Sequence, residues 1–233
     1  PGLFAGMAVG VLISVVIAFL VGLPTLRLKG DYLAIATLGV AEIIRVAVTN
    51  MKITNGAAGI SGVPLTNTWT ITYIALVLTT ILILNYTFSS AGRATYAVLQ
   101  DEIAAESMGV QVTKYKILAF VLGAATASIG GTLSATTLGA VTPSDFTFMK
   151  SIDVLIIVVF GGIGSFTGSF VAAVLLGIIN LVLQPFGQLR MIIYAVALIL
   201  IMIFRPGGLL GTWEFKLGDF KFSKKKETKE SGK

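Results

Sequence analysis

The sequence contains no cysteine and no histidine. Their absence excludes disulfides, cysteine nucleophiles, imidazole general bases and zinc sites built on those two residue types. Charged residues are also scarce, at 12% of the 233 residues, whereas an average globular domain carries about 25%. No nucleophile, base and metal ligand converge in the remaining residues, so we expect a protein that is not an enzyme and binds no cofactor or metal directly.

Hydrophobic residues make up 55% of the chain and fall into long blocks. A bilayer requires about 20 apolar residues for each helical span. The sequence therefore predicts an all-α, polytopic transmembrane helical bundle over residues 1–211. A basic tail at residues 212–233 follows, and we expect it to be cytoplasmic and disordered. The apolar blocks lie at Leu3–Leu23, Tyr32–Val48, Trp69–Phe88, Ile117–Leu138, Ile152–Leu183 and Leu189–Phe204.

Positive charges indicate how the bundle is oriented, because cytoplasmic loops carry an excess of Lys and Arg. Placing the tail, the segment 93–116 and the turn at Arg27 and Lys29 on the cytoplasmic side gives one consistent topology. A nucleic-acid-binding role for the tail is disfavoured, because no base-contacting motif accompanies its charge. The lysines of the tail are Lys216, Lys221, Lys224, Lys225, Lys226, Lys229 and Lys233.

This topology constrains both ends of the chain. An odd number of crossings must separate Leu138 from the tail. The block Ile152–Leu183 therefore either re-enters and leaves on one face or crosses twice as two short helices. Pro1 lies on the outer side, and no charged signal-peptide region precedes the first block. We expect N-terminal residues of the full protein, with an odd number of spans if its N-terminus is cytoplasmic, to precede Pro1.

The polar segment 93–116 holds most of the mid-chain charge. Asp101 can cap a short helix, Glu102 suits its positive first turn, and Gly109 can end it in the left-handed conformation. A short helix parallel to the membrane is suited to docking against a soluble partner. A solvated linker with interfacial helicity is the alternative, and the residues alone leave both open.

Glu42 and Arg45 interrupt the second apolar block. They are three residues apart and therefore share one face of a helix. Charges at the bilayer centre are costly, so both side chains must face protein or water. They either belong to the transport pathway or a subunit interface, or form a structural ion pair near the outer interface, where Arg45 snorkels. We favour the structural pair.

Four glycines, Gly161, Gly162, Gly164 and Gly168, break the fifth block. The run is not a P-loop, because no Lys-Ser or Lys-Thr pair follows it. It is not a dinucleotide-binding fingerprint either, because Thr167 stands where that fingerprint requires its last glycine. Broken helices line substrate sites in many transporters. Close helix packing is the alternative, and the sequence does not choose between them.

A small residue recurs at every fourth position of the block Ile117–Leu138. Such a stripe allows a neighbouring helix to approach closely. We favour packing within one subunit, and a seam between two subunits is the alternative. The stripe consists of Ala119, Gly123, Ala127, Gly131 and Ala135.

Residues 101–109 are similar to the EAA loop of ABC importer permeases, in which a short helix docks into an ATPase subunit. The general pattern of that loop is E-A-A-x-x-x-G, and Ala104, Ala105 and Gly109 match it. Ile103 stands in the place of the glutamate, and Glu102 lies one residue earlier.

A longer series of stretches resembles the branched-chain amino acid permease family in the family's own order. This coverage is more specific than the loop alone, and the family's glycine-rich N-terminal helices are not found in the chain. The stretches are Leu26–Ile35, Thr37–Gly39, Glu42–Arg45, Asn55–Gly56, Gly59–Pro64, Asp101–Gly109, Val112–Lys116, Ala119–Phe120, Gly161–Ser165 and Phe204–Gly211.

The resemblance implies a permease subunit in a bacterial plasma membrane. Such a subunit pairs with a paralogous permease and binds two ATPase subunits, which use ATP-Mg. A periplasmic or lipid-anchored protein delivers Leu, Ile or Val, and the permease alternates access without catalysing a reaction. The alternatives are a related permease for a sugar, an amide or another amino acid, or an ion-coupled secondary transporter, for which Glu42 is the candidate coupling carboxylate.

Overall fold

The structure is a computed structural model that describes residues 2–66, 68–162 and 164–183, together with Pro185, Val196 and Ile199. The chain divides into two compact units, Pro1–Phe148 and Met149–Lys233, and each is described by itself. The predicted block at 189–204, apart from Val196 and Ile199, and the predicted tail at 212–233 lie outside the described residues.

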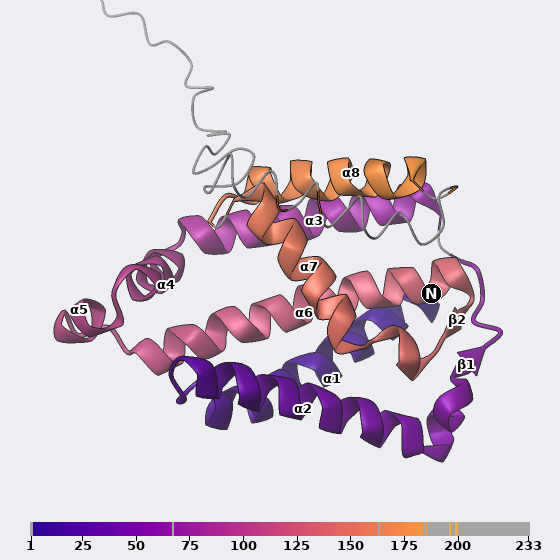
Figure 1. The fold of residues 1–233 in the computed structure, drawn as a ribbon, viewed down its shortest axis with the longest axis horizontal. Coiled ribbons are helices and arrows are strands. Elements are labelled where there is room, and N and C mark those ends of the chain that lie inside the picture. The colour runs from indigo at the N-terminus through magenta and orange to yellow at the C-terminus, as the bar shows by residue number, and fades with distance from the viewer. Residues whose placement is uncertain are drawn as a thin grey trace, which may run out of the picture. The chain divides into compact units, whose positions relative to one another are not determined.

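Among its described residues, unit 1 has four helices that are long and apolar enough to cross a membrane (Figure 1). They match the first four predicted spans, which confirms the all-α, polytopic architecture. Most boundaries agree with the prediction within two residues, but α1 continues through Pro24, and α6 begins five residues before its apolar block. The helices are α1 (Gly2–Thr25), α2 (Asp31–Asn50), α3 (Trp69–Phe88) and α6 (Val112–Leu138).

Both differences have a simple physical reason. Pro24 is the penultimate residue of α1, and its ring restricts the chain only within the last turn of the helix. The first turn and a half of α6 is polar and carries Lys114 and Lys116. Hydropathy therefore marks only the apolar part of α6, whereas backbone hydrogen bonding continues beyond it.

Helices α1 and α6 pack against each other in antiparallel fashion along a row of small residues on α1. The Ser14 hydroxyl donates to the Ala124 carbonyl at 2.9 Å. A Cβ atom at Gly10 would lie 3.2 Å from the Ser128 Oγ, and one at Gly22 would lie 3.3 Å from the Phe120 ring. Larger side chains at these α1 positions would push the two helices apart.

The predicted small-residue stripe of α6 lies one position away from this contact. Open space surrounds the position that a Cβ atom would occupy at Gly123 or Gly131 in the described structure. The close approach to α1 uses Phe120, Ala124 and Ser128 instead. The role of the stripe therefore stays a prediction.

The segments on the side predicted to be external are joined by a two-stranded antiparallel sheet. Strand β1 (Ile60–Ser61) pairs with β2 (Ala140–Val141), with Ile60 opposite Val141. Short 3-10 helices at Lys52–Thr54, Gly56–Ala58 and Pro143–Asp145 flank the strands. Since the sheet joins the α2–α3 connection to the end of α6, both lie on one side, as the predicted topology requires.

At the opposite end of unit 1, the polar segment forms two short helices, α4 (Ser90–Gln100) and α5 (Glu102–Ser107). Figure 1 shows them beyond the ends of α3 and α6, with α5 outermost.

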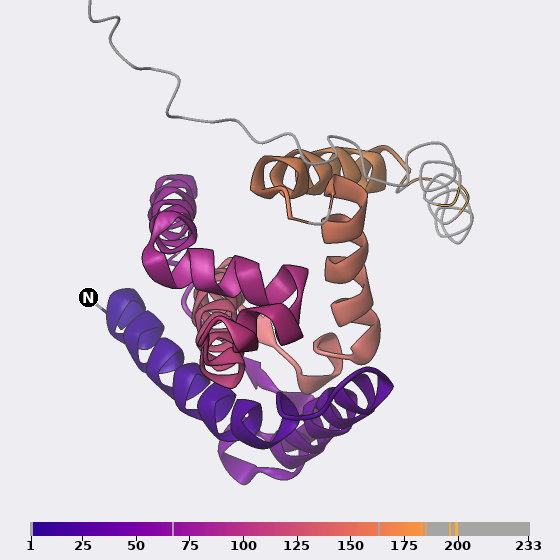
Figure 2. The ribbon, with the colours of Figure 1, turned by 90° about the vertical axis from the view of Figure 1, so that its left-hand side faces the viewer.

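Unit 2 consists, in its described part, of α7 (Phe148–Gly161, which begins at the boundary) and α8 (Phe166–Val182). The direction of the chain turns by 119° from α7 to α8 across the glycine break (Figure 2). Phe160 of α7 is buried against Ala172 and Leu176 of α8. The predicted break is confirmed, and α7 begins four residues before the block predicted at Ile152–Leu183.

Candidate functional site

Helix α4 and the turn that leads into it from α3 hold the segment around α5 in place. The Ser89 hydroxyl caps α4 by accepting from the Gly92 amide at 3.1 Å, and the Tyr86 and Thr95 hydroxyls are 2.6 Å apart. A Cβ atom at Gly92 would lie 2.7 Å from the carbonyl carbon of Thr87. The turn from α3 into α4 therefore needs glycine at this position, and it fixes the direction of α4.

Asp101 begins α5 as the sequence predicts. Its Oδ1 accepts hydrogen bonds from the amides of Ile103 at 2.8 Å and Ala104 at 3.1 Å. Two of the amides that have no partner inside the helix are thereby satisfied. A six-residue helix is not stable by itself in water, so this cap is an important part of what holds α5.

Gly109 ends α5, again as predicted. Its φ is +82°, in the left-handed region that favours glycine. The Gly109 amide donates to the Glu106 carbonyl at 2.9 Å, and the Val110 amide donates to the Ala105 carbonyl at 3.0 Å. These two bonds form a Schellman motif, which reverses the chain directly into α6.

The faces of α5 differ in exposure. The Ala105 side chain is buried, with 5% of its surface exposed, whereas Ile103 is 74% exposed and Met108 is 84% exposed. Ala104 is also exposed. The alanine pair of the loop pattern is therefore divided, since one member packs inward and the other faces outward.

An ion pair between Glu102 and Lys116 joins α5 to the first turns of α6. The sequence interpretation assigned Glu102 only to the first turn of the helix and used Lys116 only to orient the chain. The two residues are 14 positions apart, on different helices with a turn between them, so no helical spacing in the sequence predicted the pair.

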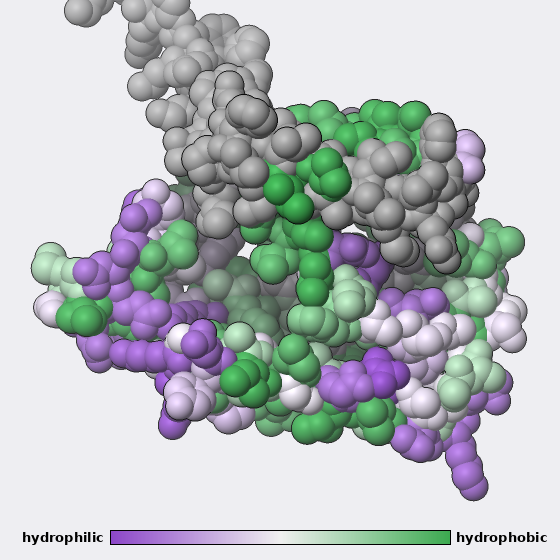
Figure 3. All heavy atoms as spheres, in the orientation of Figure 1, coloured by the Kyte–Doolittle hydropathy of each residue, from purple (hydrophilic) through white to green (hydrophobic). Residues whose placement is uncertain are grey.

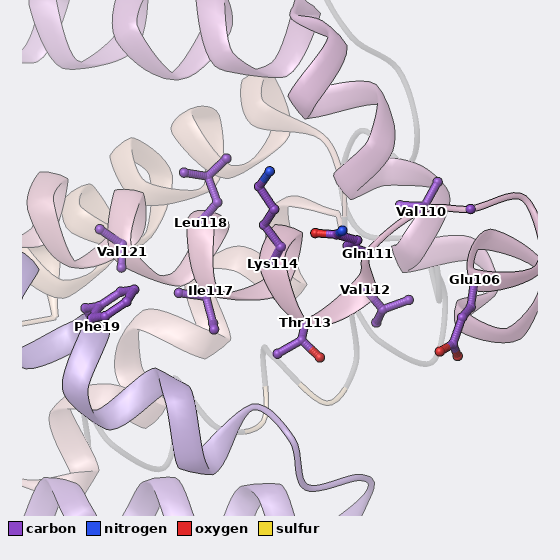
Figure 4. A pocket seen from close by; sticks show the side chains of 11 residues that line it. Phe19, Glu106, Val110, Gln111, Val112, Thr113, Lys114, Ile117, Leu118 and Val121 are labelled. Carbon is purple, nitrogen blue, oxygen red and sulfur yellow. The ribbon is translucent and has the colours of Figure 1, made fainter.

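A cavity of about 840 Å³ lies beside this segment (Figure 4). Phe19 of α1 and Ile117 and Val121 of α6 form its apolar part, and Glu106 and Gln111 lie at its polar end. Thr113 and Lys114 of α6 line it as well. Within the described ranges, no cluster of three acidic residues could hold a metal ion.

The charged pair that the sequence predicted lies on α2. The Arg45 Nε donates to the Glu42 Oε2 at 2.9 Å, and a second guanidinium nitrogen pairs with the other oxygen. Ile44 lines a cavity with Ser14 and Ala18 of α1. Because successive residues turn by about 100° around a helix, Glu42 lies on the side of α2 that faces away from α1.

The four glycines form the corner between α7 and α8. Gly162 and Gly164 have φ values of +115° and +92°. A Cβ atom at Gly161 would lie 2.5 Å from the Gly168 carbonyl carbon. The Ser165 hydroxyl caps α8 by accepting from the Gly168 amide at 3.0 Å. Close packing accounts for these glycines, and their place in a pathway stays a prediction.

The structure thus brings Asp101, Glu102, Ala104, Ala105 and Gly109 together at one end of unit 1. Glu42 and Arg45 lie elsewhere in unit 1, within a span. The glycine corner belongs to unit 2. Lys116 and the exposed pair Ile103 and Met108 were not among the predicted site residues, although Ile103 was noted as the departure from the loop pattern.

The family model of the branched-chain amino acid transport system permease component matches residues 1–204. The high-affinity branched-chain amino acid transport system permease proteins LivM of Salmonella typhimurium and Escherichia coli are 37% and 34% identical, over 85% and 90% of this chain. LivH of Escherichia coli is 30% identical over 61% of this chain and 46% of its own length.

The chain spans 55% and 57% of the lengths of the two LivM relatives. No solved structure matches it significantly. The family match covers all of unit 1 and the described part of unit 2, including both helices of the glycine corner. The chain belongs to the permease family of branched-chain amino acid transport systems.

Proposed function

We propose that this chain supplies most of a transmembrane permease subunit of an ATP-driven ABC importer for branched-chain amino acids. The observation that carries the proposal is α5, a capped helix that projects beyond the membrane-spanning helices of a permease-family chain and exposes apolar side chains. A helix so placed is suited to receive movement from a soluble partner. We place the protein in a bacterial inner membrane, with the segment 93–116 and the tail in the cytoplasm.

Four partners follow from the proposal. Two ATPase subunits dock against the cytoplasmic face and use ATP-Mg. A paralogous permease completes the membrane portion, as the coexistence of LivM and LivH relatives in Escherichia coli suggests. A periplasmic or lipid-anchored binding protein delivers the amino acid. The chain itself catalyses nothing, because hydrolysis takes place on the ATPases.

Each residue of the coupling segment has a mechanical role in this proposal. Asp101 and Gly109 fix the two ends of α5, Ala105 seats the helix against its own subunit, and Ala104 faces the partner. Movement of the ATPases on binding ATP then shifts α5 as a rigid body. Because α5 leads directly into α6, which runs to the external sheet, the shift reaches the outer side of unit 1.

For the pathway we propose Glu42, Arg45 and the glycines 161, 162, 164 and 168, or an interface with the second permease formed by the same residues. The ion pair supports this placement because Glu42 faces away from α1 within a span, and its charge therefore needs protein or water around it. The glycine corner supports it because broken helices commonly border substrate sites in transporters.

The direct test is uptake of labelled Leu, Ile and Val into proteoliposomes that contain the full complex and its binding protein. We expect uptake to require ATP and to continue after the ion gradients have been collapsed. Uptake that follows an ion gradient without ATP would support a secondary transporter instead. Uptake of a sugar, an amide or another amino acid alone would correct the substrate.

A second test addresses the coupling role. Ala105→Glu and Gly109→Lys should leave the subunit inserted but abolish the stimulation of ATP hydrolysis by loaded binding protein. Gln100→Lys, at an exposed position just before α5, is the matched control and should retain stimulation. Unchanged stimulation in both α5 variants would contradict the docking role.

A further inference from the structure

The two sides of α5 carry different chemistry. With about 100° between successive residues, Ile103, Ala104, Ser107 and Met108 gather on one side, which we call the knob face. Glu102 and Ala105 lie on the opposite side. The knob face is exposed throughout, and its two large side chains are apolar.

The only glutamate in the first turn of α5 is directed into the protein's own structure. Glu102 pairs with Lys116 of α6, and its side chain is 36% exposed, against 21% for that of Lys116. The position at which the EAA pattern has glutamate is occupied by Ile103 on the knob face. The shift of the acidic residue by one position thus moves the charge from the outward side of α5 to the inward side.

The knob face lies outside the membrane-spanning part of unit 1. Figure 1 shows α5 as the outermost element at its end of the unit, beyond the ends of α3 and α6. Figure 3 shows hydrophobic atoms there among hydrophilic neighbours, at a distance from the apolar surface of the spans. Because these side chains lie beyond the ends of the spans, we take a soluble protein, and not lipid, as their occupant.

We propose that α5 docks through Ile103 and Met108 into an apolar socket on the ATPase subunit, and that Glu102 is a positioning residue that braces α5 against α6. This inference rests on the proposed function and adds the chemistry of the contact. An apolar socket matches a large exposed side chain such as Ile103, because interface energy concentrates in a few well-packed anchors. The brace gives the docked helix a rigid connection to α6.

The first experiment uses substitutions at Ile103 in the full-length permease, paired with its partner permease and without bound ATPase. Ile103→Glu restores the glutamate of the general pattern, yet we expect it to weaken ATPase binding about thirtyfold, the effect of losing one anchor. Ile103→Leu should bind normally. Gln100→Glu adds the same charge one residue before Asp101 and should also bind normally. Binding is measured by titrating fluorescent ATPase onto permease in nanodiscs.

The second experiment separates the brace from the docking face. Glu102→Gln should retain ATPase binding within about threefold but lower the number of amino acids imported per ATP hydrolysed. Lys116→Glu should do the same, and the exchanged pair Glu102→Lys with Lys116→Glu should restore the ratio. A role limited to folding would lower the amount of complex without changing this ratio.

Several outcomes would overturn the inference. Normal or tighter binding by Ile103→Glu would show that the socket accepts a carboxylate. Loss of ATPase binding in Glu102→Gln would place Glu102 in the interface, and an exchanged pair that stays uncoupled would exclude the brace. These results differ from failure of the proposed function, in which the unsubstituted complex itself would bind no ATPase or import nothing.

Discussion

Helices α5 and α2 differ in whether contacts within this chain stabilise the helix and its charged side chains. Helix α5 has six residues, but a carboxylate cap, a Schellman motif, a buried alanine and an ion pair to α6 hold it within its own chain. Helix α2 has 20 residues, none of which is buried. Its Arg45 pairs with Glu42, which lies on the side away from α1.

The difference shows which part of the molecule is complete by itself. Everything that defines α5 is supplied by residues 89–116, so α5 can keep its shape before a partner binds. A span with an outward-facing ion pair is stable in a membrane only where protein or water covers the charges. We infer that α2 depends on the assembled transporter and that α5 does not.

The largest expected effect comes from breaking the pair on α2. Arg45→Leu leaves Glu42 alone inside a span, and removing one partner of a desolvated pair is strongly destabilising. We expect the amount of assembled complex in the membrane to fall by about tenfold or more. Quantitative immunoblotting of affinity-purified complex measures it. Unchanged amounts of complex would show that α2 is stable without protein or water around its charged side chains.

Two double variants sharpen this prediction. Glu42→Leu with Arg45→Leu removes both charges, and we expect most of the complex to be recovered, because apolar replacements of a buried pair are often neutral. The exchange Glu42→Arg with Arg45→Glu restores the ion pair in reverse. Recovery of both complex and uptake would identify a structural pair, whereas recovery of complex alone would place the pair in the pathway.

Local contacts also determine the corner between α7 and α8, and we expect a substitution there to have an effect of intermediate size. Gly161→Ala places a Cβ atom 2.5 Å from the Gly168 carbonyl carbon and the Ser169 Cα, so the angle between α7 and α8 must open. Overpacking of this kind costs about 1–3 kcal/mol. Thermal unfolding of the complex should shift downward, while Gly177→Ala, where a Cβ atom meets open space, should not shift it. Equal stability of the two variants would contradict the close packing.

The sequence predicted most where local chemistry decides the structure. The bounds of α3 were predicted to the residue, and Asp101 and Gly109 were correctly assigned to the ends of α5. Pairing between β1 and β2 was not predicted, because two residues per strand carry no alternation of polar and apolar side chains. The contact between Glu102 and Lys116 depends on how α4 and α5 fold back onto α6, which no single segment encodes.

The smallest expected effect tests whether α5 is held from within its own chain. Asp101→Ala removes the acceptor for the Ile103 and Ala104 amides, and loss of such a cap costs about 1 kcal/mol. Hydrogen exchange at these two amides should accelerate about fivefold in permease without ATPase, while α3 is unchanged. Asp101→Asn keeps an oxygen acceptor and should exchange at nearly the original rate. If the amides exchange equally fast in Asp101→Ala and in the unsubstituted protein, α5 is unformed until the ATPase docks, and the contrast with α2 disappears.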